Sequence, residues 1–152
     1  YNGRESKILK LRKLDHAMIF VLIAGTYTPI GLTALKGTLG YVLLILVWAL
    51  AIVGTISKVM FINMPRWLSA GMYLFLGWLS IFFIVPLFKA LPTGGFVWLV
   101  TGGVLYTIGS VFYASKSKIN IAGFGFHEIF HLFILAGSLA HFILINEYIF
   151  NM

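Results

Sequence analysis

The stretch GYVLLILVWALAIVGTISKVMF, residues 40–61, decides the fold of this chain. It holds no charged residue before Lys58, and as an α-helix it is long enough to cross the hydrocarbon core of a bilayer. Its apolar residues are continuous and do not alternate with a period of two, so a transmembrane β-strand is a poor alternative. The stretch therefore predicts a membrane-spanning helix.

Four further apolar stretches surround it, at residues 14–35, 68–91, 96–113 and 121–150. Glycine, proline and lysine interrupt the chain between them. The chain is 61% hydrophobic and only 10% charged, a composition that belongs in a bilayer. Because the connections are short, consecutive helices become antiparallel neighbours. We therefore predict an all-α integral membrane bundle of five transmembrane helices that forms one domain over residues 1–152.

Basic residues are divided unequally between the two ends of these predicted helices. The formal net charge is +7, and nine basic residues fall on the side of the N-terminus while only Lys36 and Lys89 fall on the other. By the positive-inside rule, the N-terminus is predicted to be cytoplasmic and the C-terminus outside, in a plasma or inner membrane. Headgroup anchoring explains this distribution, so we expect membrane lipids and no nucleic acid as partners. The nine residues are Arg4, Lys7, Lys10, Arg12, Lys13, Lys58, Arg66, Lys116 and Lys118.

The stretch His127-Glu128-Ile129-Phe130-His131 places ionisable residues inside the fifth predicted span, where they are costly and usually functional. Histidines four positions apart lie on one face of a helix, so His127 and His131 can face one ion. Asp15 opens the first span, which begins on the same side of the membrane. If the two helices are neighbours, these side chains form a set of nitrogen and oxygen ligands that suits zinc.

Other interpretations of the same residues remain open. An intramembrane histidine can serve only as a hydrogen-bonded residue between helices, and Asp15 can cap its helix. The letters also match the H-E-x-x-H motif of zinc proteases, with Glu128 as general base. However, Glu147 is the only acidic residue after His131, and it lies about 24 Å further along the helix, too far to complete such a site.

Two more histidines are expected to lie outside the metal site. His141 lies about 15 Å beyond His131 along the helix and is expected to line a polar cavity or to bond a neighbouring helix. His16 points away from Asp15 and is expected at the membrane interface. In the fourth and fifth spans, Gly102, Gly109 and Gly137 predict close contacts between helices.

Ten short motifs occur along the chain: Lys13-Leu14-Asp15-His16, Leu22-Ile23-Ala24-Gly25-Thr26-Tyr27-Thr28-Pro29, Met72-Tyr73-Leu74, Gly77-Trp78, Leu91-Pro92-Thr93-Gly94-Gly95, Tyr106-Thr107-Ile108-Gly109, Phe112-Tyr113, His127 to His131, Gly137-Ser138 and His141-Phe142. Together they resemble the bacterial hemolysin III branch of the progestin and adipoQ receptor family, and the match runs through all five spans in order.

The resemblance implies a seven-helix protein with a cytoplasmic N-terminus and a zinc site near the cytoplasmic face. The chain would then correspond to helices three to seven, and since it begins at Tyr1, we expect that an N-terminal part with the first two helices is missing. His127 and His131 would be the last-helix zinc ligands, and Asp15 the carboxylate of the third helix, which often reaches the metal through water. The family's remaining histidine ligand, on its second helix, has no counterpart here.

For function, the resemblance implies a zinc-dependent hydrolase of lipid amides, similar to ceramidases. Asp15 would be the catalytic group that orients or deprotonates water. The alternatives are a receptor-like protein, or a cytolytic, pore-forming protein, with a structural zinc ion. The remaining alternative, an intramembrane metalloprotease, rests only on the match of residues 127–131 to the H-E-x-x-H motif.

Overall fold

The computed structural model describes residues 2–61, 64–115 and 123–152 of the chain. Over these ranges it contains helices and no β-strand, as expected. Five helices are long and apolar enough to cross a membrane, at Gly3–Ala34, Thr38–Met60, Arg66–Ala90, Thr93–Ser115 and Phe126–Ile149. The predicted all-α membrane bundle is therefore confirmed.

Three of the five spans contain a segment of π-helix or 3₁₀-helix besides α-helix. The first consists of α1 (Asn2–Pro29) and the π-helical segment η1 (Ile30–Ala34), and the second is α2 (Thr38–Met60). The third consists of α3 (Arg66–Gly77), the 3₁₀ segment η2 (Trp78–Phe83) and α4 (Ile84–Ala90). The fourth is α5 (Thr93–Ser115), and the fifth joins α6 (Phe126–Ile143) to the π-helical segment η3 (Leu144–Ile149).

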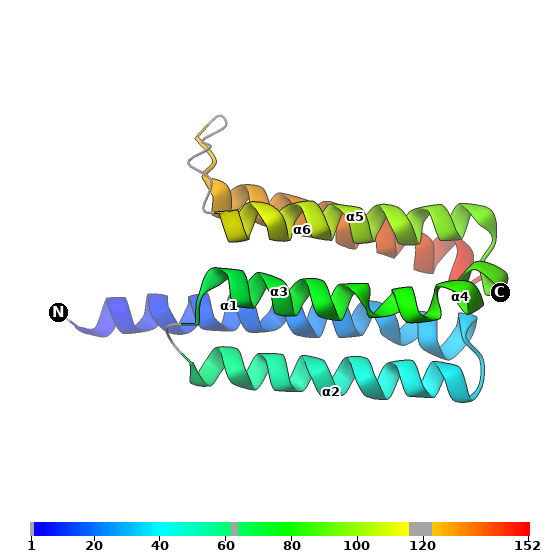
Figure 1. Cartoon of the computed structure of the whole chain (residues 1–152). Helices are drawn as coiled ribbons and strands as arrows, with labels where there is room; N and C mark the ends of the chain where they lie inside the picture. The colour runs from blue at the N-terminus through cyan, green and yellow to red at the C-terminus, as the bar shows by residue number, and fades with distance from the viewer. Residues whose placement is uncertain (1, 62–63, 116–122) are drawn as a thin grey trace.

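Helix α1 begins well before the predicted start of its span at residue 14. Its charged first turns project beyond the rest of the bundle (Figure 1), and their side chains are largely exposed. Hydropathy identifies the part of a helix that lies in the bilayer, but lysine, arginine, glutamate and leucine also favour a helix in water. At the other end of the chain, α6 begins at Phe126, later than the predicted residue 121, which lies outside the described residues.

The helices pack as two pairs joined by a central one. Helix α1 packs along α2, α5 packs along α6, and α3 contacts both α1 and α5 (Figure 1). Glycine allows the close approach of α5 and α6, since a Cβ atom on Gly109 would lie 2.8 Å from the Cβ atom of Phe133. A Cβ atom on Gly137 would lie 2.6 Å from the ring of Tyr106. These contacts agree with the close packing that glycine predicted in the last two spans.

The third span is interrupted near its middle by the 3₁₀ segment η2, just before Pro86. Proline removes a backbone donor and clashes with the preceding turn, so the helix rewinds there. Tyr27 of α1 reaches this break, where its hydroxyl donates to the carbonyl of Gly77 at 2.5 Å. The same oxygen accepts a hydrogen bond from the amide of Ser80 at 3.1 Å. A side chain from the first span thus supports the backbone of the third.

Candidate metal centre

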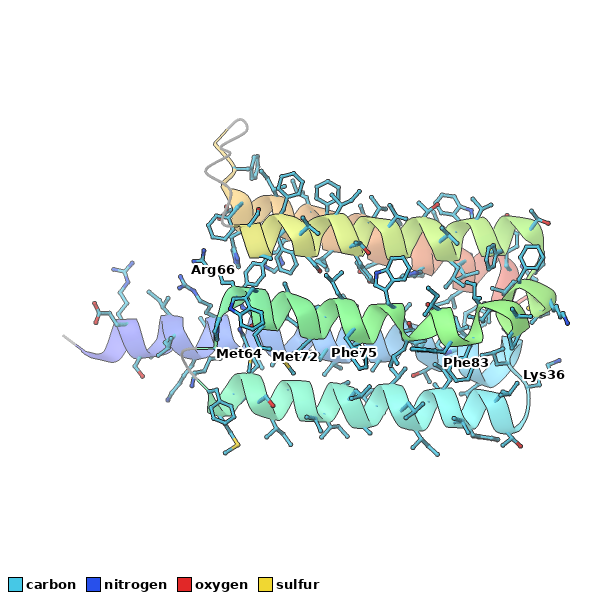
Figure 2. The ribbon with its side chains drawn as sticks, viewed as in Figure 1. Lys36, Met64, Arg66, Met72, Phe75 and Phe83 are labelled. Atoms are coloured by element: carbon cyan, nitrogen blue, oxygen red, sulfur yellow. The ribbon has the colours of Figure 1, made fainter. Side chains whose placement is uncertain are left out.

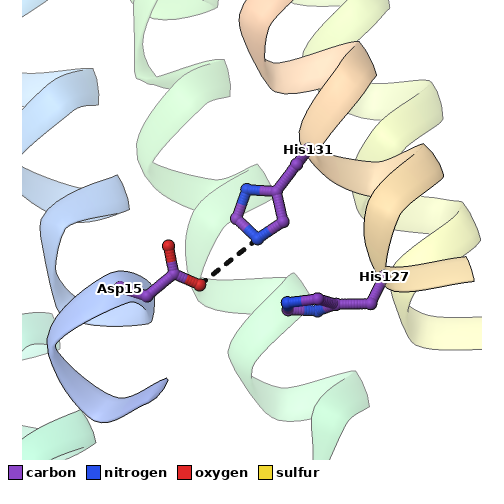
Figure 3. Close-up of side chains that lie close together, drawn as sticks. All are labelled: Asp15, His127 and His131. Carbon is purple, nitrogen blue, oxygen red and sulfur yellow. Dashed lines mark ion pairs between the residues drawn. The ribbon is translucent and has the colours of Figure 1, made fainter. Parts of the chain in front are cut away.

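Asp15 of α1 meets His127 and His131 of α6 at one end of the bundle (Figure 3). One carboxylate oxygen, Oδ2 of Asp15, lies 3.2 Å from Nε2 of His131. Each of the three residues offers one ligand atom, and all three atoms lie within 4.8 Å of one another. The structure therefore brings the three predicted site residues together into a group that can hold a metal ion.

Helical geometry places the two histidines on the same side of α6. Their ring centroids are 4.6 Å apart, and both rings are partly exposed. The intervening residues Ile129 and Phe130 are buried and fix this face of the helix against the bundle. The histidine spacing thus follows from the sequence alone, whereas the approach of Asp15 depends on how α1 and α6 pack.

The donor set fits a tetrahedral metal such as zinc. Metal–ligand bonds of about 2.0–2.1 Å place neighbouring ligand atoms roughly 3.3 Å apart in a tetrahedron. The Asp15–His131 distance of 3.2 Å already matches this spacing, and the widest separation in the group, up to 4.8 Å, must close by about 1.5 Å. Rotation of partly exposed side chains can supply a movement of that size.

The site opens into a groove between α1 and α6 with a volume of about 760 Å³. Side chains of Asp15 and His131 are 44% and 31% exposed, so both are accessible from this groove. Most of the remaining groove wall is apolar, with Met18, Leu22 and Phe142 among its residues. The candidate metal centre therefore lies where an apolar surface meets accessible polar ligands.

His16 is buried beside the site, and the prediction that it points away from Asp15 is wrong, since its Nδ1 atom lies 3.7 Å from Oδ2 of Asp15. Its side chain is 4% exposed, and its Nδ1–H donates to the carbonyl of Arg12 at 2.8 Å. The ring stacks on His127, with centroids 5.6 Å apart and planes inclined by 27°. On the other side, Tyr73 of α3 donates to the His16 carbonyl at 3.0 Å. Tyr113 of α5 and His127 of α6 pack against the His16 ring, and no local pattern in the sequence predicts that packing.

The other ionisable residues of α6 and η3 lie apart from the metal group. Glu128 is exposed and is not among the grouped ligands. Glu147 accepts a hydrogen bond from Asn146 at 2.7 Å near the C-terminal end. His141 is buried, and its Nε2–H donates to the carbonyl of Leu99 on α5 at 3.4 Å. His141 thus bonds a neighbouring helix, which is one of the two roles expected from its position.

Comparison with known proteins identifies relatives over most of the chain. The family model described as "Haemolysin-III related" matches residues 4–142. The "Hemolysin-3 homolog" of Bacillus subtilis is 46% identical over 138 residues, which cover 91% of this chain and 62% of that protein. "Hemolysin-3" of Bacillus cereus is 42% identical over 137 residues, which cover 90% of this chain and 60% of that protein.

A more distant relative extends the comparison beyond bacteria. The human "Monocyte to macrophage differentiation factor" is 28% identical over 138 residues, which cover 90% of this chain and 55% of that protein. This match supports the relationship to the progestin and adipoQ receptor family. The chain spans about three fifths of the length of the bacterial relatives. No solved structure matches it. On the strength of the family match over residues 4–142, the chain belongs to the haemolysin-III related family of multi-pass membrane proteins.

Proposed function

We propose that this protein is a zinc-dependent hydrolase of lipid amides whose active site is the Asp15, His127 and His131 group. The observation that carries the proposal is the convergence of these three ligands at the mouth of an apolar groove. An apolar groove suits the hydrocarbon chain of a lipid. The amide bond of a lipid bound in this way would lie beside the polar ligands at the mouth of the groove.

The exposure of the ligands favours catalysis over a purely structural metal. Structural zinc sites are closed by four protein ligands, whereas catalytic sites use three and keep one position open. Within residues 2–61, 64–115 and 123–152 the group consists of two imidazoles and one carboxylate, and that carboxylate, Asp15, is 44% exposed. An accessible carboxylate beside two imidazoles is the arrangement that a water-activating site requires.

Each residue of the site has a distinct role in this proposal. When bound, zinc supplies a Lewis acid that polarises a carbonyl group and increases the acidity of water. The imidazoles of His127 and His131 hold the ion, and His16 limits the rotation of the His127 ring on which it stacks. The carboxylate of Asp15 orients the attacking water and accepts its proton. The groove side chains exclude bulk water from the acyl part of the substrate.

We also propose that the metal centre faces the cytoplasm. Arg66 lies at one end of the bundle and Lys36 at the opposite end (Figure 2), and the Arg66 guanidinium lies 4.6 Å from the ring centroid of Phe126, the residue before His127. Most basic residues of α1 precede Asp15, and two of the nine that carry the topology prediction, Lys116 and Lys118, lie outside the described residues. Cysteine at Asn151 should react with an impermeant thiol reagent in intact cells, and cysteine at Glu5 should not. The reverse labelling pattern would place the site on the outer face.

The enzymatic proposal is tested on the purified full-length protein by measuring zinc content and lipid amide hydrolysis together. His127→Ala and His131→Ala should each abolish stoichiometric zinc. Asp15→Asn should keep much of the metal, because both imidazoles remain, but should lose most hydrolysis since an amide cannot accept the proton. Glu128→Gln should change neither quantity, whereas in a protease that uses this residue as general base it would abolish activity.

Two measurements together would refute the enzymatic proposal. If zinc removal lowers thermal stability while no lipid amide is hydrolysed by the wild-type protein, the metal is structural. The receptor-like or cytolytic alternatives would then hold.

A further inference from the structure

His141 has a buried ring nitrogen that the fold leaves without a partner. The side chain is only 7% exposed, and among the described residues its Nδ1 atom is buried with no hydrogen-bond partner. Burying a polar atom without a partner costs free energy, on the order of 1–3 kcal/mol. The chain nevertheless makes room for this ring, since a Cβ atom on Gly102 would collide with the imidazole.

The imidazole of His141 lines an internal cavity of about 120 Å³. The cavity lies between α1, α3, η2, α5 and α6, and its wall is mostly apolar. Tyr106 of α5 also lines it, and the Tyr106 ring meets the His141 ring edge to face with centroids 5.2 Å apart. The cavity is comparable with an engineered apolar cavity of about 150 Å³ that holds benzene. It therefore has room for an apolar group of about six carbon atoms.

The cavity wall also reaches the lipid-facing surface between η2 and α5. Trp78 and Val100 belong to the wall and are 47% and 45% exposed. The indole N–H of Trp78 donates to the hydroxyl of Thr107 on α5 at 3.0 Å, so one side chain bridges the two elements at this point. The cavity wall therefore includes side chains that also lie on the outer surface of the helices.

The hydrogen bond from His141 to Leu99 determines which chemical group the other ring nitrogen of His141, Nδ1, can bind. A carbonyl oxygen only accepts, so Nε2 of His141 carries the hydrogen that it donates to Leu99. In the neutral imidazole, Nδ1 then carries a lone pair and needs a donor. An ether, an ester or a carboxylate cannot supply one, but a hydroxyl group can.

We propose that this cavity is a binding site for a membrane-soluble alcohol. The hydroxyl of the alcohol donates a hydrogen bond to Nδ1 of His141, and its hydrocarbon part fills the space enclosed by the apolar wall. His141 lies about 15 Å along α6 from His131, and the site uses none of the metal ligands. It shares Ile19, Thr26 and His141 with the wall of the groove beside the metal centre, but the test below measures binding and needs neither zinc nor hydrolysis.

The test uses photolabelling of the purified full chain in lipid nanodiscs with a diazirine-bearing hexanol. The label should attach to the peptides of α5 and α6 that line the cavity, including the one that holds Ile134. Two isomers compete for the site, 1-hexanol and methyl pentyl ether, which have the same atoms but differ in the O–H donor. The alcohol should compete about tenfold better, the ratio that one hydrogen bond to an otherwise unpaired buried atom supplies.

Variants of His141 assign the preference to the ring nitrogen. His141→Leu removes the acceptor and should bring the ratio of alcohol to ether close to one. His141→Asn can place an amide oxygen near the position of Nδ1 and should restore the preference, whereas His141→Gln extends past it and should not.

The wild-type competition alone can overturn the proposal, so the result does not depend on the variants folding. Equal competition by alcohol and ether would show that the site does not recognise a hydroxyl group. Absence of label from the cavity peptides would show that the alcohol does not bind there. A preference that survives in His141→Leu would place the hydroxyl on another residue.

Discussion

The glycine contact between α5 and α6 gives the sharpest quantitative prediction. In Gly109→Ala the added Cβ atom would lie 2.8 Å from Cβ of Phe133, and the helices must separate by about 0.6 Å to restore the ordinary 3.4 Å. The Cβ atom of Phe133 is fixed to its backbone and cannot rotate away. Overpacking of this kind costs about 1–3 kcal/mol, and alanine returns about 0.5–1 kcal/mol through helix propensity. We therefore expect a net destabilisation of about 1–2 kcal/mol.

A matched control lies in the same helix. A Cβ atom on Gly103 would meet nothing within 4 Å, so Gly103→Ala should be neutral or stabilising by up to about 1 kcal/mol. Unfolding in mixed micelles with increasing dodecyl sulfate, followed by circular dichroism, measures both variants against wild type. If Gly109→Ala is as stable as Gly103→Ala, the α5–α6 packing described above is wrong.

Three further outcomes concern the metal centre and its support. His16→Leu should weaken zinc binding by about 10–100-fold in a chelator competition, because the stacked ring that orients His127 is lost; unchanged affinity would remove His16 from the site. Tyr73→Phe should lower stability by about 1 kcal/mol in the same unfolding assay, since it deletes the 3.0 Å hydrogen bond to the His16 carbonyl, and no change would contradict that bond. If the free zinc concentration is 100 times its Kd, removal of zinc by a chelator should lower the free energy of unfolding by about 2.7 kcal/mol. A free energy of unfolding that does not change with zinc would argue against an ion held between α1 and α6.

Hydrophobic length and helical periodicity account for what the sequence predicts well here. Five apolar runs predict five spans, and the four-residue spacing of His127 and His131 predicts their common face. Both inferences depend only on neighbours along one helix. The approach of Asp15 to His131 was a weaker inference, since it required α1 and α6 to be neighbours at the same depth.

Features that depend on packing between helices could not be predicted in the same way. The burial of His16 results from the positions of α5 and α6, and the early start of α1 results from helix propensity in charged residues that hydropathy excludes. The unpaired nitrogen of His141 depends on which carbonyl its other nitrogen reaches on α5. These are properties of contacts between residues far apart in the chain.

The contact between Tyr27 and the 3₁₀ segment η2 also bears on the order in which the chain is assembled. Hydrogen bonds in a 3₁₀ segment have poorer geometry than those of an α-helix, and weakly bonded backbone is costly in hydrocarbon. Tyr27 supplies a donor to Gly77 and an acceptor to Ser80, and it is synthesised about fifty residues before them. Because synthesis starts at the N-terminus, the first span is made before the third. The hydroxyl of Tyr27 is therefore already present when the 3₁₀ segment that it bonds enters the bilayer.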